Sequence, residues 1–64
     1  MKEFKFRDKV KVTQGFFEGQ RGLLVDTGKR RYVNGHLFVD YKLQLEDMGG
    51  EVWVDNHSLE LIDN

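Results

Sequence analysis

The sequence predicts an all-β domain that closes into a small barrel of five short strands. Apolar and polar residues alternate with a period of two in several segments, as expected of strands with one buried face. Glycine-bearing turns separate these segments, and no segment sustains the apolar stripe of an amphipathic helix. Closure is favoured because an open sheet of this length leaves unpaired edges and buries little apolar surface.

Length, cysteine content and net charge limit the classes of protein to which this sequence can belong. The 64 residues are expected to form one domain, residues 1–64, without a linker or an internal repeat. The sequence has no cysteine, which excludes disulfides and thiolate metal sites. Ten basic and eleven acidic residues leave a net charge of −1, whereas a domain that depends mainly on phosphate contacts is normally basic.

The sequence also predicts where the protein acts. No apolar run approaches the roughly 20 residues that a membrane-spanning helix needs. The N-terminal stretch MKEFKFRDK lacks the apolar core of a signal peptide. We therefore expect a cytoplasmic monomer that binds no membrane, cofactor or small-molecule substrate.

Alternation assigns the strand faces and a core. Val10 and Val12 share one face, as do the alternate residues from Leu37 to Leu45. In the segment EVWVD, the two valines share a face and Trp53 points the opposite way. The predicted core consists of Val10, Val12, Leu24, Val39, Tyr41, Leu43, Val52, Val54, Leu59 and Leu61.

Glycine and capping residues predict the turns. Asn34-Gly35 is typical of a two-residue type I′ hairpin turn, and Gly49-Gly50 meets the same backbone demand. Gly28 predicts a bulge or bend within a strand. The stretch DNHSLE, residues 55–60, predicts a single helical turn because three of its residues are of capping type.

Residues 10–24, VKVTQGFFEGQRGLL, resemble a KOW motif. In that motif an alternating strand is followed by a glycine, then by an aromatic residue, and then by a further glycine that opens the next strand. The matching positions are Val10, Val12, Gly15, Phe17, Gly19, Gly22 and Leu24. The resemblance is closest to the C-terminal domain of NusG-class transcription elongation factors. It continues by pattern through residues 36–45, 51–55 and 56–62.

The resemblance implies a five-stranded SH3-like barrel with a short helical turn before the last strand. It also implies a non-catalytic module that contacts RNA, ribosomal proteins or transcription-termination partners. Two features differ from the family. The segment TGKRRYVNG lengthens the connection between the second and third strands, and the later hairpin, LEDMGGE, is acidic where relatives are often basic.

Phe16 and Phe17 are the first candidate binding residues. Adjacent side chains point to opposite sides of an extended segment, so one ring is expected to face inward and the other outward. Phe17 occupies the aromatic position of the motif, and Phe16 would project into water, where an apolar patch marks a contact site. The alternative is that both rings fold over the end of the barrel and complete its core.

The one basic run of the sequence ends beside an aromatic residue and comprises Lys29, Arg30, Arg31 and Tyr32. Basic side chains can pair with phosphates while a neighbouring ring stacks on a base. Together with Arg21, Lys9 and Lys11, the run could form one basic face despite the near-zero net charge. The alternative is a solvated hairpin whose cations pair with Asp26 and Asp40.

Trp53 is a third candidate, because alternation places it on the outer face of the sheet. Outward tryptophan is enriched at binding interfaces. The surrounding stretch VWVDNHSLEL is also loosely similar to the groove region of peptide-binding SH3 domains. The alternative is that the indole covers the outside of the sheet against Phe38, or against Phe4 and Phe6 near the N-terminus.

Nothing in the sequence indicates catalysis. His57 lies beside Asp55 and Ser58 on one turn, which is too close for the geometry of a nucleophile, its base and an orienting group. The stretch GFFEGQRG lacks the following helix and the lysine–serine pair of a phosphate-binding loop. We therefore expect a protein that is not an enzyme and holds no metal.

Three functional hypotheses follow. The first is an accessory factor in transcription or translation that contacts RNA or a ribosomal or transcription protein, through a surface formed by Phe16, Phe17, Arg21, Lys29, Arg30, Arg31 and Tyr32. The second is a protein–protein adaptor that uses Trp53 and the acidic hairpin. The third is a small phage-type structural accessory protein with no nucleic-acid role.

Overall fold

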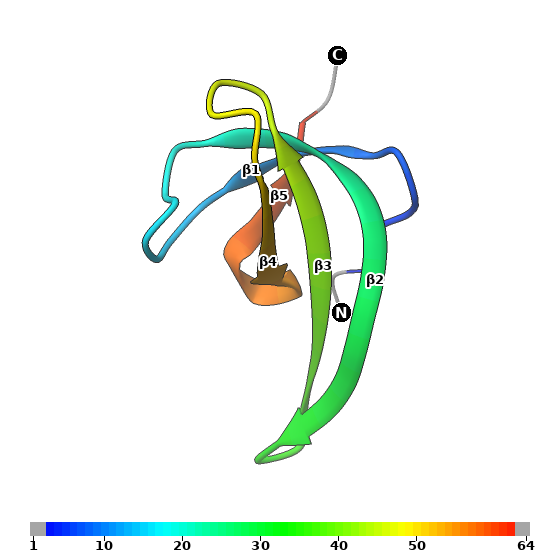
Figure 1. The fold of residues 1–64 in the computed structure, drawn as a ribbon. Helices are drawn as coiled ribbons and strands as arrows, with labels where there is room; N and C mark the ends of the chain where they lie inside the picture. The colour runs from blue at the N-terminus through cyan, green and yellow to red at the C-terminus, as the bar shows by residue number, and fades with distance from the viewer. Residues whose placement is uncertain (1–2, 63–64) are drawn as a thin grey trace.

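The computed structural model describes residues 3–62 and consists of five antiparallel strands in one sheet. The elements are β1 (Lys9–Val12), β2 (Arg21–Val33), β3 (His36–Leu45), β4 (Glu51–Asp55), the 3₁₀ turn η1 (Asn56–Ser58) and β5 (Leu59–Leu61), as labelled in Figure 1. The all-β class, the five strands and the helical turn before the last strand are confirmed. No helix within the described residues is long and apolar enough to cross a membrane.

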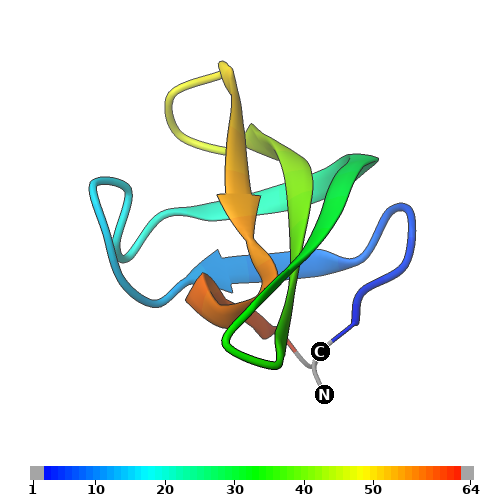
Figure 2. The same ribbon diagram turned by 90° about the horizontal axis from the view of Figure 1, so that it is seen from below.

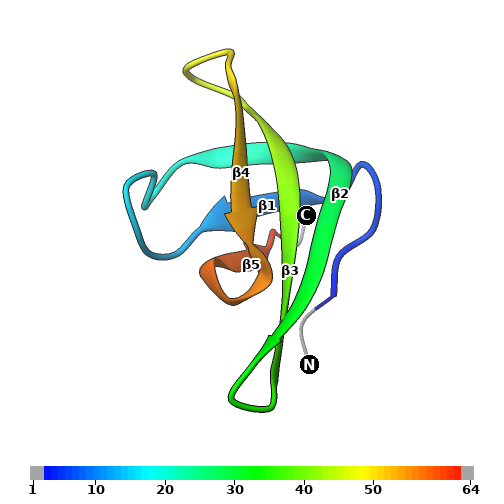
Figure 3. The same cartoon turned by 60° about the horizontal axis from the view of Figure 1, so that its bottom comes forward.

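The strand order is β4-β3-β2-β1-β5, so β4 and β5 are the two edges of the sheet. The sheet folds over, and β3 and β4 run across β1 and β5 on the other side (Figure 3). The predicted closure into a barrel is not observed, because no ladder joins β4 to β5 anywhere in residues 3–62. The turn η1 carries the chain from β4 to the far side of the sheet, where β5 pairs with β1 instead.

The strand β2 belongs to both halves of the folded sheet. Its first residues pair with β1 and with β3, and its last residues pair with β3 alone. The register with β3 shifts between Leu24 and Asp26 and again between Thr27 and Arg30. Such bulges bend and twist a strand. The bulge predicted at Gly28 is therefore confirmed, and Figures 1 and 2 show the long curved hairpin that results.

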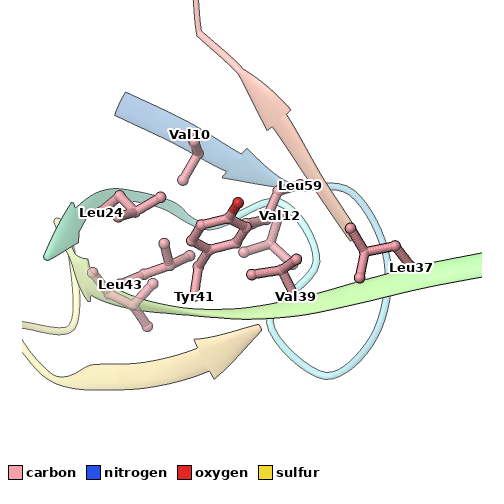
Figure 4. Close-up of a cluster of buried hydrophobic side chains, with 9 residues drawn as sticks. Val10, Val12, Leu24, Leu37, Val39, Tyr41, Leu43 and Leu59 are labelled. Carbon is pink, nitrogen blue, oxygen red and sulfur yellow. The ribbon is translucent and has the colours of Figure 1, made fainter. Parts of the chain in front are cut away.

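The core lies between the two halves of the folded sheet. Figure 4 shows side chains of β1 and β3 pointing toward one another. The buried apolar residues are Val10, Val12, Leu24, Leu37, Val39, Tyr41, Leu43, Leu45 and Leu59. Leu37 and Leu45 were missing from the predicted core, although they continue the alternation of β3.

Three predicted core residues differ from expectation. Val52 and Val54 are only half-buried, packed against the rim of the core. Leu61 is 54% exposed, so its prediction was wrong. Its strand is three residues long and lies at an edge of the sheet, where β1 flanks it on one side only.

The turns follow the glycines closely. Asn34 and Gly35, with φ of 51° and 81°, form the two-residue connection between β2 and β3. The connection between β3 and β4 is longer, residues 46–50, and only Gly49 of the glycine pair has a positive φ, 71°. The Leu45 amide donates to the Gly50 carbonyl oxygen at 2.8 Å and closes this loop.

The segment before β1 covers the core without forming a strand. The ring of Phe4 meets that of Tyr41 edge-on at 5.6 Å, and the Phe4 amide donates to the Tyr41 hydroxyl at 3.1 Å. Phe6 is 65% exposed, so the ring of Phe4 covers the core and the ring of Phe6 does not. The reason is a tight turn over residues 5–8, in which Arg7 has a φ of 74° and the alternation of an extended chain is lost.

Candidate binding surface

The loop over residues 13–20 joins β1 to β2 and requires two glycines. Gly15 and Gly19 have φ of 94° and 90°, a region that side chains disfavour. The Gly19 amide donates to the Val12 carbonyl oxygen at 2.8 Å, and the Val12 amide donates to the Gln20 carbonyl oxygen at 2.9 Å. These bonds close the base of the loop.

The tip of this loop displays one phenylalanine and anchors the other. Phe17 is half-buried and packs against the core, whereas Phe16 is 93% exposed. The two rings meet edge-on with centroids 4.9 Å apart and planes at 85°. The predicted division between an inward Phe17 and an outward Phe16 is confirmed, so the alternative in which both rings fold over the core is wrong.

Trp53 lies on the outer face of β4, as alternation predicted, and is 52% exposed. Its ring lies directly over Gly28, because a Cβ atom built at Gly28 would come within 2.7 Å of the indole Cζ3. The Lys42 ammonium lies 5.9 Å from the centroid of the same ring. The bulge in β2 thus provides a flat surface for the indole.

The packing partners expected for Trp53 were wrong. Phe38 instead lies against the imidazole of His57, with ring centroids 4.5 Å apart, and beneath the guanidinium of Arg31 at 5.7 Å. Phe4 covers Tyr41. The absence of a side chain at position 28 of β2 leaves a gap that the indole fills by reaching across β3, and this gap depends on the bulge rather than on the alternation pattern.

A groove separates the loop tip from β4. Its cavity has a volume of about 450 Å³, and we call it the aromatic groove. The side chains of interest that line it are Phe16, Phe17, Arg31, Asp40, Trp53 and Asp55. The structure therefore brings together four candidates that the sequence had assigned to separate hypotheses, since Trp53 now shares a surface with both phenylalanines and Arg31.

One wall of the aromatic groove is fixed by hydrogen bonds among polar side chains. The side-chain amide nitrogen of Gln14, Nε2, donates to the Ser58 hydroxyl at 3.2 Å. That hydroxyl donates to Asp55 Oδ1 at 3.1 Å. Asp55 Oδ2 accepts from the His57 backbone amide at 3.0 Å, which makes Asp55 the N-cap of η1. The chain of bonds connects the loop to η1 and holds the Asp55 carboxylate in place.

An ion pair also lines the aromatic groove. Arg31 donates to Asp40 Oδ2 at 2.8 Å, with about half of the arginine side chain exposed. This contact confirms one of the two pairings expected of a solvated basic hairpin. The expected pairing of the basic run with Asp26 is wrong, because no ion pair of Asp26 is found within residues 3–62. The Asp26 carboxylate instead accepts from the Thr27 backbone amide at 2.8 Å.

A second, smaller cavity also borders the Trp53 ring. It measures about 280 Å³ and is lined by Gly28, Lys29, Asp40 and Trp53. Trp53 and Asp40 border both cavities, so the two cavities adjoin one another. Lys29 thus belongs to the same surface as the aromatic groove.

The rest of the basic run faces away from this surface. Arg30 and Tyr32 pair across the hairpin with Val39 and Leu37, which are buried, and directly opposite residues share a face. Arg30 lies 3.7 Å from Glu3 across this inner face, and Tyr32 is 72% exposed. The four residues therefore do not form one basic face, because alternation along β2 divides them.

Arg21 is also separate from the aromatic groove. It begins β2, and its carbonyl oxygen accepts from the Glu46 amide at 2.9 Å. That contact places it beside the acidic loop between β3 and β4, at the opposite end of the molecule from the β2–β3 turn (Figure 1). The predicted surface that joined Arg21 to the basic run is not formed.

Sequence reasoning missed the two carboxylates of the aromatic groove. Asp40 and Asp55 are direct partners in the register between β3 and β4. Their shared outer face follows from alternation, but their pairing depends on the five-residue loop between the strands, whose length the sequence pattern did not define.

The described residues contain no group of three or more histidine, aspartate or glutamate side chains placed to hold a metal ion. Comparisons of the chain with protein-family models, with curated proteins and with solved structures found no match.

Proposed function

We propose that this protein is a non-enzymatic protein-binding module whose partner docks in the aromatic groove. The observation that carries the proposal is the position of Phe16. This ring is almost fully exposed at the tip of a structured loop and borders the groove whose other side Trp53 forms. Exposed aromatic anchors around a cavity are the feature that distinguishes binding hot spots from ordinary surface.

We further propose an SH3-like barrel of the KOW type that is open between β4 and β5. Support comes from the position of β1 between β2 and β5, and from the helical turn that precedes the last strand. The inward ring of Phe17 and the positive φ of Gly15 and Gly19 agree with the motif. On this basis the module acts as an accessory factor in transcription or translation.

The polar groups of the groove support binding rather than catalysis. The Ser58 hydroxyl donates to Asp55, and His57 Nε2 lies 2.9 Å from the Leu37 carbonyl oxygen. A serine nucleophile that is activated by histidine instead requires a hydrogen bond from its hydroxyl to the imidazole. These groups thus serve to build the wall of the groove.

A protein partner is favoured over RNA by the charges of the surface. Arg31 is engaged with Asp40, and the cations of the run are divided between two faces of β2. A phosphate backbone would also meet two carboxylates in the groove. RNA contact through Lys29 and the exposed Tyr32 is the competing outcome, and it has a distinct dependence on salt.

The test begins with selection of binders from a random nonapeptide display library on the wild-type protein. Phe16→Ala and Trp53→Ala should each weaken binding of the selected peptides at least about tenfold, as truncation of a hot-spot aromatic does. Phe6→Ala is the matched control, because Phe6 is exposed but does not line the groove. Circular dichroism would verify that each variant is folded.

Two results would contradict the proposal. One is a failure to select any peptide that depends on Phe16 or Trp53. The other is binding of a mixed-sequence single-stranded RNA with an affinity that falls steeply with salt, and a slope that the double variant Arg30→Ala, Arg31→Ala flattens. That second result would replace the protein partner with RNA.

A further inference from the structure

Two carboxylates lie side by side in the lining of the aromatic groove. Asp40 of β3 and Asp55 of β4 are direct register partners, so their side chains project from the same face of neighbouring strands. Like charges in this position destabilise a sheet. Departures from a stabilising pattern concentrate at functional sites.

Within the aromatic groove the repulsion between the two carboxylates is only partly compensated. A further cation, Lys29, lies outside the groove lining and borders the neighbouring cavity together with Asp40. Arg31 donates to Asp40 Oδ2 at 2.8 Å. Asp55 accepts hydrogen bonds from neutral donors, the Ser58 hydroxyl and the His57 amide. Among the side chains that line the groove, one guanidinium therefore faces two carboxylates.

Aromatic rings border the same carboxylates. Trp53 lies two residues before Asp55 in β4 and therefore projects from the same face of the strand. Phe16 lines the groove from the loop tip. A cation is attracted both by aromatic faces and by carboxylates. The aliphatic carbons of a lysine or arginine side chain can also pack against the rings. Charge and shape thus complement a lysine or arginine side chain with apolar neighbours.

We infer that the partner is a peptide segment that places a lysine or arginine side chain at the Asp40–Asp55 pair, flanked by apolar residues that contact Phe16 and Trp53. This inference rests on the proposed function and names the chemistry of its partner. Arg31 competes with the partner's cation for Asp40. It pairs with Asp40 in the free protein, and this ion pair must break when the partner's cation binds.

Removal of the competitor provides the sharpest test. Arg31→Ala should tighten binding of the selected peptides about two- to fivefold, the range that a half-exposed ion pair contributes. Arg30→Ala is the matched control, since it removes the same charge from the next position but on the inner face, where Arg30 lies beside Glu3. It should leave the affinity nearly unchanged.

Changes at the carboxylate and in the peptide complete the test. Asp40→Asn should weaken binding about tenfold, as the loss of a charge-assisted hydrogen bond does. Replacement of the peptide's arginine by citrulline, which keeps the shape and removes the charge, should have a similar effect. NMR titration of capped Leu-Arg-Leu and Leu-citrulline-Leu would show larger amide shifts at Asp40 and Asp55 for the arginine peptide.

The inference is overturned if Arg31→Ala weakens binding, because Arg31 would then contact an anionic partner directly. It is also overturned if citrulline binds as well as arginine while Phe16→Ala and Trp53→Ala still abolish binding; in that case the proposed function survives without it. If no peptide depends on either aromatic residue, the proposed function fails and the inference fails with it.

Discussion

Gly28 and Trp53 are in direct contact across the β2 bulge, where a Cβ atom at residue 28 would lie 2.7 Å from the indole Cζ3. The glycine has two roles here. It occupies the register shift that bends β2, and it leaves the space in which the ring lies flat. The shape of the aromatic groove therefore depends on the absence of one methyl group.

Gly28→Ala should move the indole off the sheet. The ring is half exposed, so it can swing outward while the strands stay paired. We expect a loss of about 1 kcal/mol in the free energy of unfolding, at the low end for overpacking, and a red shift of tryptophan fluorescence. Gly50→Ala is the control, because its Cβ meets no described heavy atom within 4 Å. An unshifted emission spectrum would refute the ring displacement.

Gly22→Ala should be more damaging than Gly28→Ala. Its Cβ atom would lie 2.8 Å from the backbone carbonyl oxygen of Gln44 in the neighbouring strand β3. Backbone within a ladder cannot move aside as a surface ring can, so the expected loss in unfolding free energy is about 2–3 kcal/mol. Urea denaturation of the two variants side by side measures the difference, and equal losses would contradict it.

Asn56→Ala should destabilise the joint between η1 and β3. Asn56 is fully buried; its Oδ1 accepts from the Val39 amide at 3.0 Å, and its Nδ2 donates to the Leu37 carbonyl oxygen at 3.4 Å. Loss of a buried hydrogen-bond partner costs about 1–3 kcal/mol, which thermal denaturation would detect. Gln44→Ala, at an exposed position of β3, should change stability by less than about 0.5 kcal/mol.

Phe16→Ala and Phe17→Ala should separate binding from folding. Truncation of the exposed Phe16 should change the free energy of unfolding by less than about 0.5 kcal/mol. Truncation of Phe17, which packs against the core, should lower it by about 2 kcal/mol. Chemical denaturation of both variants checks this, and a stability loss at Phe16 equal to that at Phe17 would show that both rings belong to the core.

The sequence predicted well those features that depend on local alternation and on glycine. The outward position of Trp53, the division between Phe16 and Phe17, and the turn at Asn34-Gly35 all follow from a period of two or from a required positive φ. The same holds for most of the core, because β1 and β3 alternate without interruption. These features do not depend on which strands are neighbours.

The features that the sequence did not predict depend on register and on edges. The opposition of Asp40 and Asp55 requires the pairing of β3 with β4, and the division of the basic run follows from its pairing with β3 after two bulges. Leu61 is exposed because its strand lies at an open edge. A bulge or an unpaired edge changes which residues meet without changing the hydrophobic pattern.

Asp55 links occupancy of the groove to the integrity of the fold. Its carboxylate caps η1 and lines the groove, and η1 is the only connection between β4 and β5. A ligand held by this carboxylate in the native state alone stabilises that state by mass action. Occupancy of the groove is therefore expected to raise the melting temperature, and a compound library could be screened for groove ligands by thermal shift.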